Sequence, residues 1–78
     1  MSKKHIEECV RENLESYFKD LRGVEPTAMY EMILGVVEKP LLESVLHKLR
    51  GNQSHAAQVL GINRNTLRKK MKAHGIKG

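Results

Sequence analysis

The sequence predicts an all-α protein in which two long helices are followed by a helix-turn-helix. Apolar residues recur at helical spacing near the N-terminus, and a second segment ending near position 49 is apolar on most sides. The remaining residues form two short helical segments that flank a glycine turn and carry many basic side chains. We therefore expect four helices in one compact domain, with a dimerisation region at residues 1–49 and a helix-turn-helix at residues 50–78.

The first predicted helix covers residues 6–21. Charged residues fill the positions between its apolar residues, whose spacing is close to the 3.6-residue period of an amphipathic helix. These apolar residues are Ile6, Val10, Leu14, Tyr17, Phe18 and Leu21. Gly23 is placed to end the helix, because glycine readily takes the left-handed conformation of a C-terminal cap. Cys9 is the single cysteine, and we expect it to be a small buried apolar group.

The second predicted helix covers residues 27–49, with Thr27 as its N-cap. It is apolar around most of its circumference, at Met29, Tyr30, Met32, Ile33, Leu34, Val36, Val37, Leu41, Leu42, Val45, Leu46 and Leu49. One neighbouring helix and a small motif cannot cover so much apolar surface. Two copies of the helix pair can cover it by forming a four-helix core around a two-fold axis. The pattern therefore favours a homodimer over a monomer with exposed apolar residues.

Two residues inside this helix weaken it locally. Pro40 removes one backbone hydrogen bond, but the apolar pattern continues on both sides, so we expect the helix to bend there and continue. Gly35 leaves space for another backbone, which in a crossed dimer belongs to the second subunit.

The chain from residue 51 to residue 71 has the spacing of a helix-turn-helix. Ala57 and Leu67 suit two helices that cross closely, and Gly61 supplies the positive φ that turns the chain between them. The inside of the turn is expected to be filled by Val59, Leu60 and Ile62. The cap of the first motif helix is expected to be Asn52 or Ser54.

Charge is unevenly divided along the chain, whose formal net charge is +5. The first 49 residues contain seven Lys or Arg and nine Asp or Glu, whereas residues 50–78 contain seven Lys or Arg and no acid. Such a localised basic surface is typical of a protein that binds a polyanion. The outward face of the second motif helix carries Arg64, Asn65, Arg68, Lys69 and Lys72. The sequence therefore predicts that the motif binds double-stranded DNA.

Other classes of function fit the sequence less well. A membrane surface would require a broad apolar stripe opposite the cations, and Leu67 and Met71 are too few to form one. The sequence has no long apolar run and no signal peptide, so we expect a cytoplasmic protein without a membrane partner. The four His residues lack metal-ligand spacing, and we see neither a phosphate-binding loop nor an activated nucleophile. We therefore expect no enzymatic activity, no cofactor and no metal.

Three segments resemble the Fis family (factor for inversion stimulation), which comprises small homodimeric bacterial DNA-bending proteins of the nucleoid. They are VEKPLL at residues 37–42, RGNQ at residues 50–53 and LGINRNTLRKK at residues 60–70. The resemblance implies that the two long helices intertwine in a homodimer with a helix-turn-helix at each end. It also implies a role in transcription regulation, with RNA polymerase as a further candidate partner. Fis-like dimers hold their recognition helices closer together than one DNA turn, so the DNA must bend.

The resemblance also assigns DNA contacts residue by residue. Base contacts fall to Asn63, Arg64 and Arg68, whose side chains can bond base edges in the major groove. Phosphate contacts fall to Asn52, Gln53, Ser54, His55, Thr66, Lys69 and Lys70. Four or five neutralised phosphates per subunit would give a log–log salt slope of roughly −7 to −9.

The sequence departs from the family pattern in two places. His55 stands where Arg is expected, and neutral imidazole brings no charge to a phosphate. The chain also begins almost directly at the first long helix, without the N-terminal β-hairpin arm that activates DNA invertases in the family. The resemblance therefore does not decide whether this chain stimulates recombination.

Two alternative interpretations remain at the level of sequence. The C-terminal domain of NtrC-type enhancer-binding activators shares the motif and the dimer, but it follows an ATPase domain for which these 78 residues leave no room. The chain could also be a helical protein-interaction module whose basic end binds an acidic protein.

Overall fold

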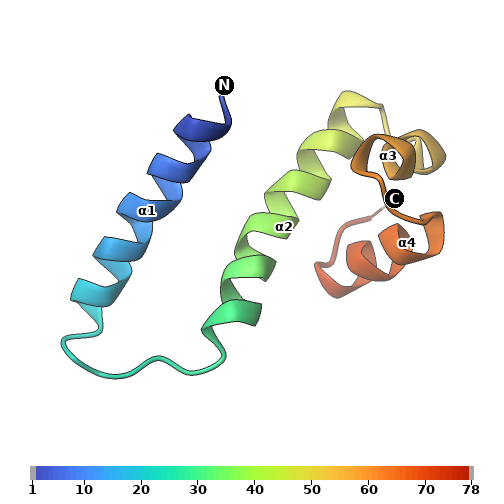
Figure 1. Cartoon of the computed structure of the whole chain (residues 1–78). Helices are drawn as coiled ribbons and strands as arrows, with labels where there is room; N and C mark the ends of the chain where they lie inside the picture. The colour runs from blue at the N-terminus through green and yellow to red at the C-terminus, as the bar shows by residue number, and fades with distance from the viewer. Residues whose placement is uncertain (1, 78) are drawn as a thin grey trace.

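The computed structural model describes residues 2–77, and within them the chain forms four helices and no strand (Figure 1). The elements are α1 (Lys3–Asp20), α2 (Met29–Lys48), α3 (Gln53–Leu60) and α4 (Arg64–Ala73). Figure 1 shows α1 and α2 as an antiparallel pair, with α3 and α4 gathered at the C-terminal end of α2. The predicted all-α fold with a C-terminal helix-turn-helix is confirmed.

The first helix begins earlier and ends earlier than its apolar pattern predicts. Ser2 caps α1 by accepting a hydrogen bond from the backbone N–H of His5 at 3.1 Å. The helix ends at Asp20, with Leu21 as its C-cap. Arg22 and Gly23 then both adopt positive φ, at 51° and 83°. Gly23 therefore belongs to the reversal that follows the helix, and it does not cap the helix directly.

The second helix starts at Met29, and the prediction of Thr27 as its N-cap is wrong. The cap position is Ala28, whose backbone is left-handed (φ 51°) and whose side chain makes no capping hydrogen bond. Because the chain makes its sharp turn at Ala28, Thr27 lies one position too early to reach the free N–H groups. The helix then continues through Pro40, as expected.

The core of the molecule lies where α2, α3 and α4 meet. Six apolar residues are buried there, namely Leu42, Leu46, Ala56, Ala57, Leu67 and Met71. Leu67 and Ala56 have no exposed surface, which places a large side chain against a small one where the helices cross closely. Gly61 ends α3 with a φ of 75°, as the motif predicts. Val59 does not fill the turn, because 59% of its surface is exposed.

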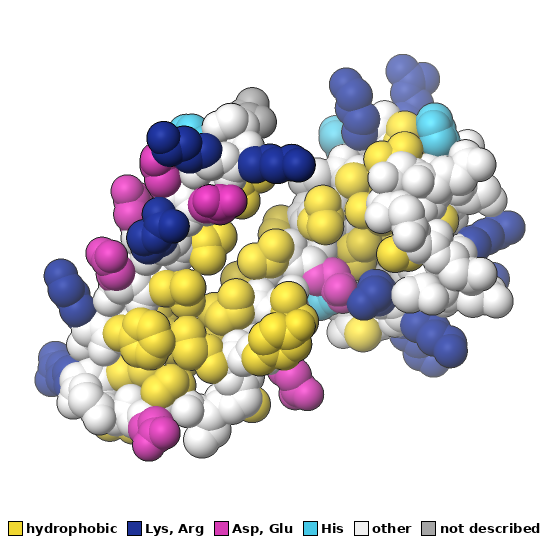
Figure 2. Space-filling model, in the orientation of Figure 1, with side chains coloured by type: hydrophobic (Ala, Val, Ile, Leu, Met, Phe, Trp, Pro, Cys, Tyr) yellow, Lys and Arg dark blue, Asp and Glu magenta, His cyan; other side chains and the backbone are white. Residues whose placement is uncertain are grey.

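The α1–α2 pair leaves its apolar residues largely uncovered. No residue of α1 is buried, and α2 buries only Leu42 and Leu46, both near its C-terminal end. Large apolar side chains are exposed along both helices, at Ile6, Val10, Phe18, Tyr30, Met32, Leu34, Val36, Val37 and Leu41. Figure 2 shows many hydrophobic side chains between these two helices, open to the viewer. Cys9 is exposed at this surface, so it is not the buried group expected.

Truncating Leu67 tests the core directly. Leu67→Ala removes a fully buried side chain, and we expect it to lower the free energy of unfolding by about 2–5 kcal/mol. Val59→Ala is the matched control, because Val59 is largely exposed and its truncation should change stability by no more than about 0.5 kcal/mol. Urea denaturation followed by circular dichroism measures both values. Equal losses for the two variants would contradict the placement of the core.

Candidate nucleic-acid interface

Both helices of the motif begin with an asparagine cap. Asn52 Oδ1 accepts a hydrogen bond from the backbone N–H of His55 at 3.1 Å, so Asn52, and not Ser54, caps α3. Asn63 Oδ1 accepts from the backbone N–H of Asn65 at 2.7 Å and caps α4. Each cap uses the carbonyl oxygen of its amide and leaves the NH₂ group, a donor, for other partners. The caps fix where each helix starts and hence which side chains face outward.

The basic residues of α4 lie mainly on its exposed side. Arg64, Arg68, Lys69 and Lys72 are exposed, and so is Thr66. Figure 2 shows Lys and Arg groups around the motif end of the molecule. Over α1, Lys and Arg groups are mixed with acidic groups. The predicted cationic face of α4 is therefore present in the folded chain, although Lys70 lies outside it.

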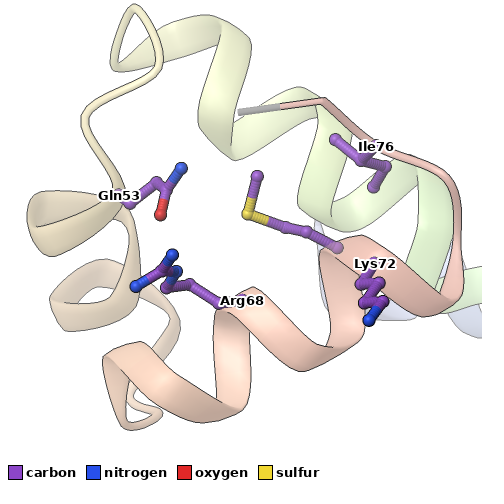
Figure 3. Close-up of a pocket in the computed structure, with 5 residues that line it drawn as sticks. Gln53, Arg68, Lys72 and Ile76 are labelled. Atoms are coloured by element: carbon purple, nitrogen blue, oxygen red, sulfur yellow. The ribbon is translucent and has the colours of Figure 1, made fainter.

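A shallow pocket lies beside this face. It has a volume of about 350 Å³ and is lined by Gln53, Arg68, Met71, Lys72 and Ile76. Figure 3 shows Gln53 and Arg68 at the α3 side of the pocket, with Lys72 and Ile76 at the opposite end. Gln53 comes from the first turn of α3 and Arg68 from the middle of α4. The fold thus brings one predicted phosphate contact and one predicted base contact to the same hollow.

Of the other predicted phosphate contacts, Ser54 and His55 are exposed in the first turn of α3. They lie next to the backbone N–H groups at the N-terminus of this helix, which favour a nearby anion. Ser54, His55 and Gln53 therefore form one polar group at the start of α3, separated along the chain from the cations of α4.

Lys70, a predicted phosphate contact, is paired with an acidic residue in the folded chain. Its Nζ lies 2.8 Å from Oε2 of Glu38 on α2, and the side chain is only partly exposed. Oε1 of the same carboxylate lies 2.9 Å from Nε2 of His74. The His74 side chain is largely buried, with 17% of its surface exposed. These hydrogen bonds, first from Lys70 and then from His74, hold the pKa of Glu38 below its ordinary value of 4.5.

No local sequence pattern indicates that Glu38 contacts Lys70 and His74. Glu38 and Lys70 are 32 positions apart, and Glu38 and His74 are 36 apart. Only the i, i+4 spacing of Lys70 and His74 indicates that the two side chains share one side of α4. Which carboxylate they meet depends on how α4 crosses α2.

Within residues 2–77, no helix has the length and apolar character needed to cross a membrane.

Comparisons with known proteins agree on one family. A family model described as "Bacterial regulatory protein, Fis family" matches residues 33–74. A protein of Neisseria meningitidis serogroup A, named as Fis-like and DNA-binding, is 58% identical over 71 residues, which cover 91% of this chain and 90% of that protein. A similarly named protein of Ralstonia nicotianae is 51% identical over 76 residues, covering 97% of this chain and 99% of the relative.

A longer relative is also similar. The DNA-binding protein Fis of Proteus mirabilis is 45% identical over 76 residues. The matched region covers 97% of this chain and 78% of the Proteus protein.

The lowered pKa of Glu38 predicts how its contribution to stability depends on pH. A carboxylate whose pKa is lower in the folded chain stabilises the fold above its unfolded pKa, and this stabilisation is lost as pH falls through the folded pKa. We expect Glu38→Gln to lower the melting temperature by about 2–5 °C near neutral pH. The difference from the wild type should shrink steadily once the pH falls below about 4.5.

Glu43→Gln is the control for this measurement, because Glu43 is exposed on the same helix and has no ion pair within residues 2–77. Its melting temperature should follow the wild type at every pH. A Glu38→Gln difference that is unchanged in acid would contradict the ion-pair explanation.

Proposed function

Because this chain belongs to the Fis family of bacterial regulatory proteins, we propose that it is a homodimeric protein that binds and bends DNA. In this proposal it acts in the cytoplasm, on the bacterial nucleoid, as a regulator of transcription. The observation that carries the proposal is the exposed basic face of α4, which a helix-turn-helix presents outward. Relatives named as DNA-binding support the same assignment.

The exposed surface of a single chain supports the homodimer. Its accessible area is 6691 Å², whereas a compact monomer of 8.9 kDa would expose about 4,800 Å². Its radius of gyration is 14.9 Å, against about 11.5 Å for a compact domain of this length. Most of the large apolar side chains that are exposed lie on α1 and α2. A second copy of the same helix pair would cover this surface and complete a four-helix core.

The groove between α1 and α2 gives the place where the second copy would pack. Its volume is about 320 Å³, and its walls are almost entirely apolar. Residues from both helices line it, including Val10 and Leu14 of α1 and Ile33, Val36 and Val37 of α2. Because the apolar strip is shared by the two helices, an isologous interface would bury both of them at once.

In the proposed complex, α4 of each subunit enters a major groove. Arg64 and Arg68 donate paired hydrogen bonds to guanine, and Asn63 donates through the NH₂ group that its capping bond leaves available. Around them, the phosphate contacts fall to Asn52, Gln53, Ser54, His55, Thr66 and Lys69. With Lys70 paired to Glu38, the exposed cations of α4 are Arg64, Arg68, Lys69 and Lys72. If these cations neutralise about four phosphates per subunit, the log–log salt slope would be roughly −7.

Bending follows from the dimer in this proposal. Two recognition helices held closer than about 34 Å cannot both enter successive major grooves of straight DNA. The duplex then bends and its central minor groove narrows, so base pairs that touch no protein contribute to selectivity through their flexibility. Because we propose that this complex regulates transcription, we also propose RNA polymerase as a further partner.

A charge placed in the α1–α2 groove tests the dimer. Val37→Glu puts a carboxylate where the second copy would pack, and burying it unpaired should raise the dimer dissociation constant at least about 100-fold. Val59→Glu is the control, because Val59 is an exposed apolar residue outside this groove. Sedimentation equilibrium measures the mass of both variants. A dimeric Val37→Glu protein would count against this interface.

Replacing two arginines tests the recognition helix. We expect Arg64→Ala combined with Arg68→Ala to weaken binding to DNA at least about 100-fold while the dimer stays intact. Lys19→Ala combined with Arg22→Ala is the matched control, since it removes two cations at the far end of α1. A gel shift with a random-sequence pool of about 30 base pairs, followed by sequencing of the bound fraction, measures affinity and selectivity together.

The selected sequences then distinguish the interpretations. A degenerate two-fold site with an AT-rich centre supports a bending dimer. A well-defined palindrome with wider half-site spacing favours the arrangement of enhancer-binding activator domains. Wild-type protein that leaves every duplex unbound would favour the protein-interaction module.

A further inference from the structure

The carboxylate of Glu38 connects α2 to two side chains of α4. It meets Lys70 Nζ at 2.8 Å with one oxygen and His74 Nε2 at 2.9 Å with the other. These are the only ion pairs within the described part of the chain, residues 2–77. We propose that Glu38 is a positioning residue of the DNA interface, which holds Lys70 against α2 and withholds its charge from the DNA phosphates. The inference rests on the proposed DNA-binding function.

The position of Lys70 on α4 supports this inference. Lys70 follows Leu67 by three residues and precedes Met71 by one, and both of these side chains are buried. His74 follows Lys70 by one helical turn, so both lie along the side of α4 that meets α2. Arg68 precedes Lys70 by two residues, which rotates the two side chains about 160° apart around the helix. Lys70 thus points away from the exposed arginines.

The position of Glu38 on α2 is equally constrained. Glu38 precedes the buried Leu42 by four residues and therefore lies on the side of α2 that packs into the core. Gly35 lies one turn earlier, and a Cβ there would come within 3.9 Å of His74 Cε1. The His74 ring therefore lies directly against α2. One carboxylate with two partners a turn apart can fix both the distance and the rotation of α4 relative to α2.

The pair lies near enough to the surface for Lys70 to turn outward once the carboxylate at position 38 is neutralised. The side chains of Lys70 and Glu38 are 37% and 29% exposed, and such partly hydrated pairs are individually weak. His74 strengthens the arrangement because it gives the carboxylate a second donor at 17% exposure. Removing one negative charge at position 38 should therefore be sufficient to release Lys70. The number of phosphates that each subunit neutralises would then increase by one.

A double-mutant cycle tests whether Glu38 withholds Lys70. Binding to one fixed duplex is measured over a range of salt for the wild type, Glu38→Gln, Lys70→Ala and the double variant. We expect Lys70→Ala to change the log–log salt slope by less than about one in the wild type. In the Glu38→Gln background it should make the slope shallower by about two, because one released phosphate contact per subunit is lost from the dimer.

Two further variants separate this effect from net charge and from folding. Glu43→Gln adds the same charge to α2 at an unpaired, exposed position, and Lys70→Ala should act there as it does in the wild type. Glu38→Asp keeps the net charge but withdraws the carboxylate by one methylene, so it should also steepen the salt slope. Melting curves of each variant check that it is folded, and Glu38→Asp replaces Glu38→Gln in the cycle if the latter is unfolded.

The outcomes are distinguishable. Equal slope changes for Lys70→Ala in the wild-type and Glu38→Gln backgrounds would overturn the inference and leave DNA binding by the chain intact. Wild-type protein that does not bind the duplex would overturn the proposed function and, with it, this inference. If Lys70→Ala makes the salt slope shallower only in the background in which Glu38 is replaced, the result supports the proposal that Glu38 withholds Lys70 from DNA.

Discussion

The close crossing of α3 and α4 is the constraint on which the rest of the structure depends. Ala56 and Leu67 have no exposed surface and Ala57 almost none, so a larger side chain at either alanine would separate the two helices. Leu67 fixes which side of α4 is buried, and the exposed positions of the arginines follow from helical geometry. The same rotation directs Lys70 and His74 toward α2, where Glu38 receives both. The packing of Leu67 therefore determines which side chains of α4 are exposed, and it also determines which ones reach Glu38 on α2.

The helix-turn-helix and the α1–α2 pair differ in how much of their apolar surface a single chain buries. The motif completes a small core with the end of α2, and its exposed surface is mostly polar. The α1–α2 pair has two apolar faces and too few neighbours, so a single chain leaves most of that surface in water. In the proposed homodimer the rigidity of α2 would link these halves, because its C-terminal end belongs to the motif core and the rest to the dimer. The spacing of two recognition helices, and hence any bend in DNA, would then be determined by α2.

The parts of the fold that sequence reasoning predicted are those determined by local chemistry. Gly61 ends α3 through its backbone freedom, and Asn52, one of the two predicted candidates, caps the same helix with its short amide. Leu67 is buried where α4 crosses α3, as its spacing from Ala57 and Gly61 predicts. The failures arise where distant or unusual conformations decide the outcome. Ala28 replaces Thr27 at the start of α2 because the chain turns there in a left-handed conformation that alanine rarely adopts. The placement of Lys70 required knowledge of a residue 32 positions away.

The Glu38 contact shows that the basic residues of α4 do not all have the same surroundings. Counting cations between positions 64 and 72 gives five, and all of them could be assigned to DNA from the sequence alone. These five cations point in different directions around α4. A cation beside the buried face of α4 can reach α2 as well as DNA. An acid on that supporting helix then lowers the effective charge of the interface and also fixes the orientation of the recognition helix. In the proposed complex, the charge that DNA meets would therefore depend on how α4 packs on α2, and it would be smaller than the charge that the motif contains.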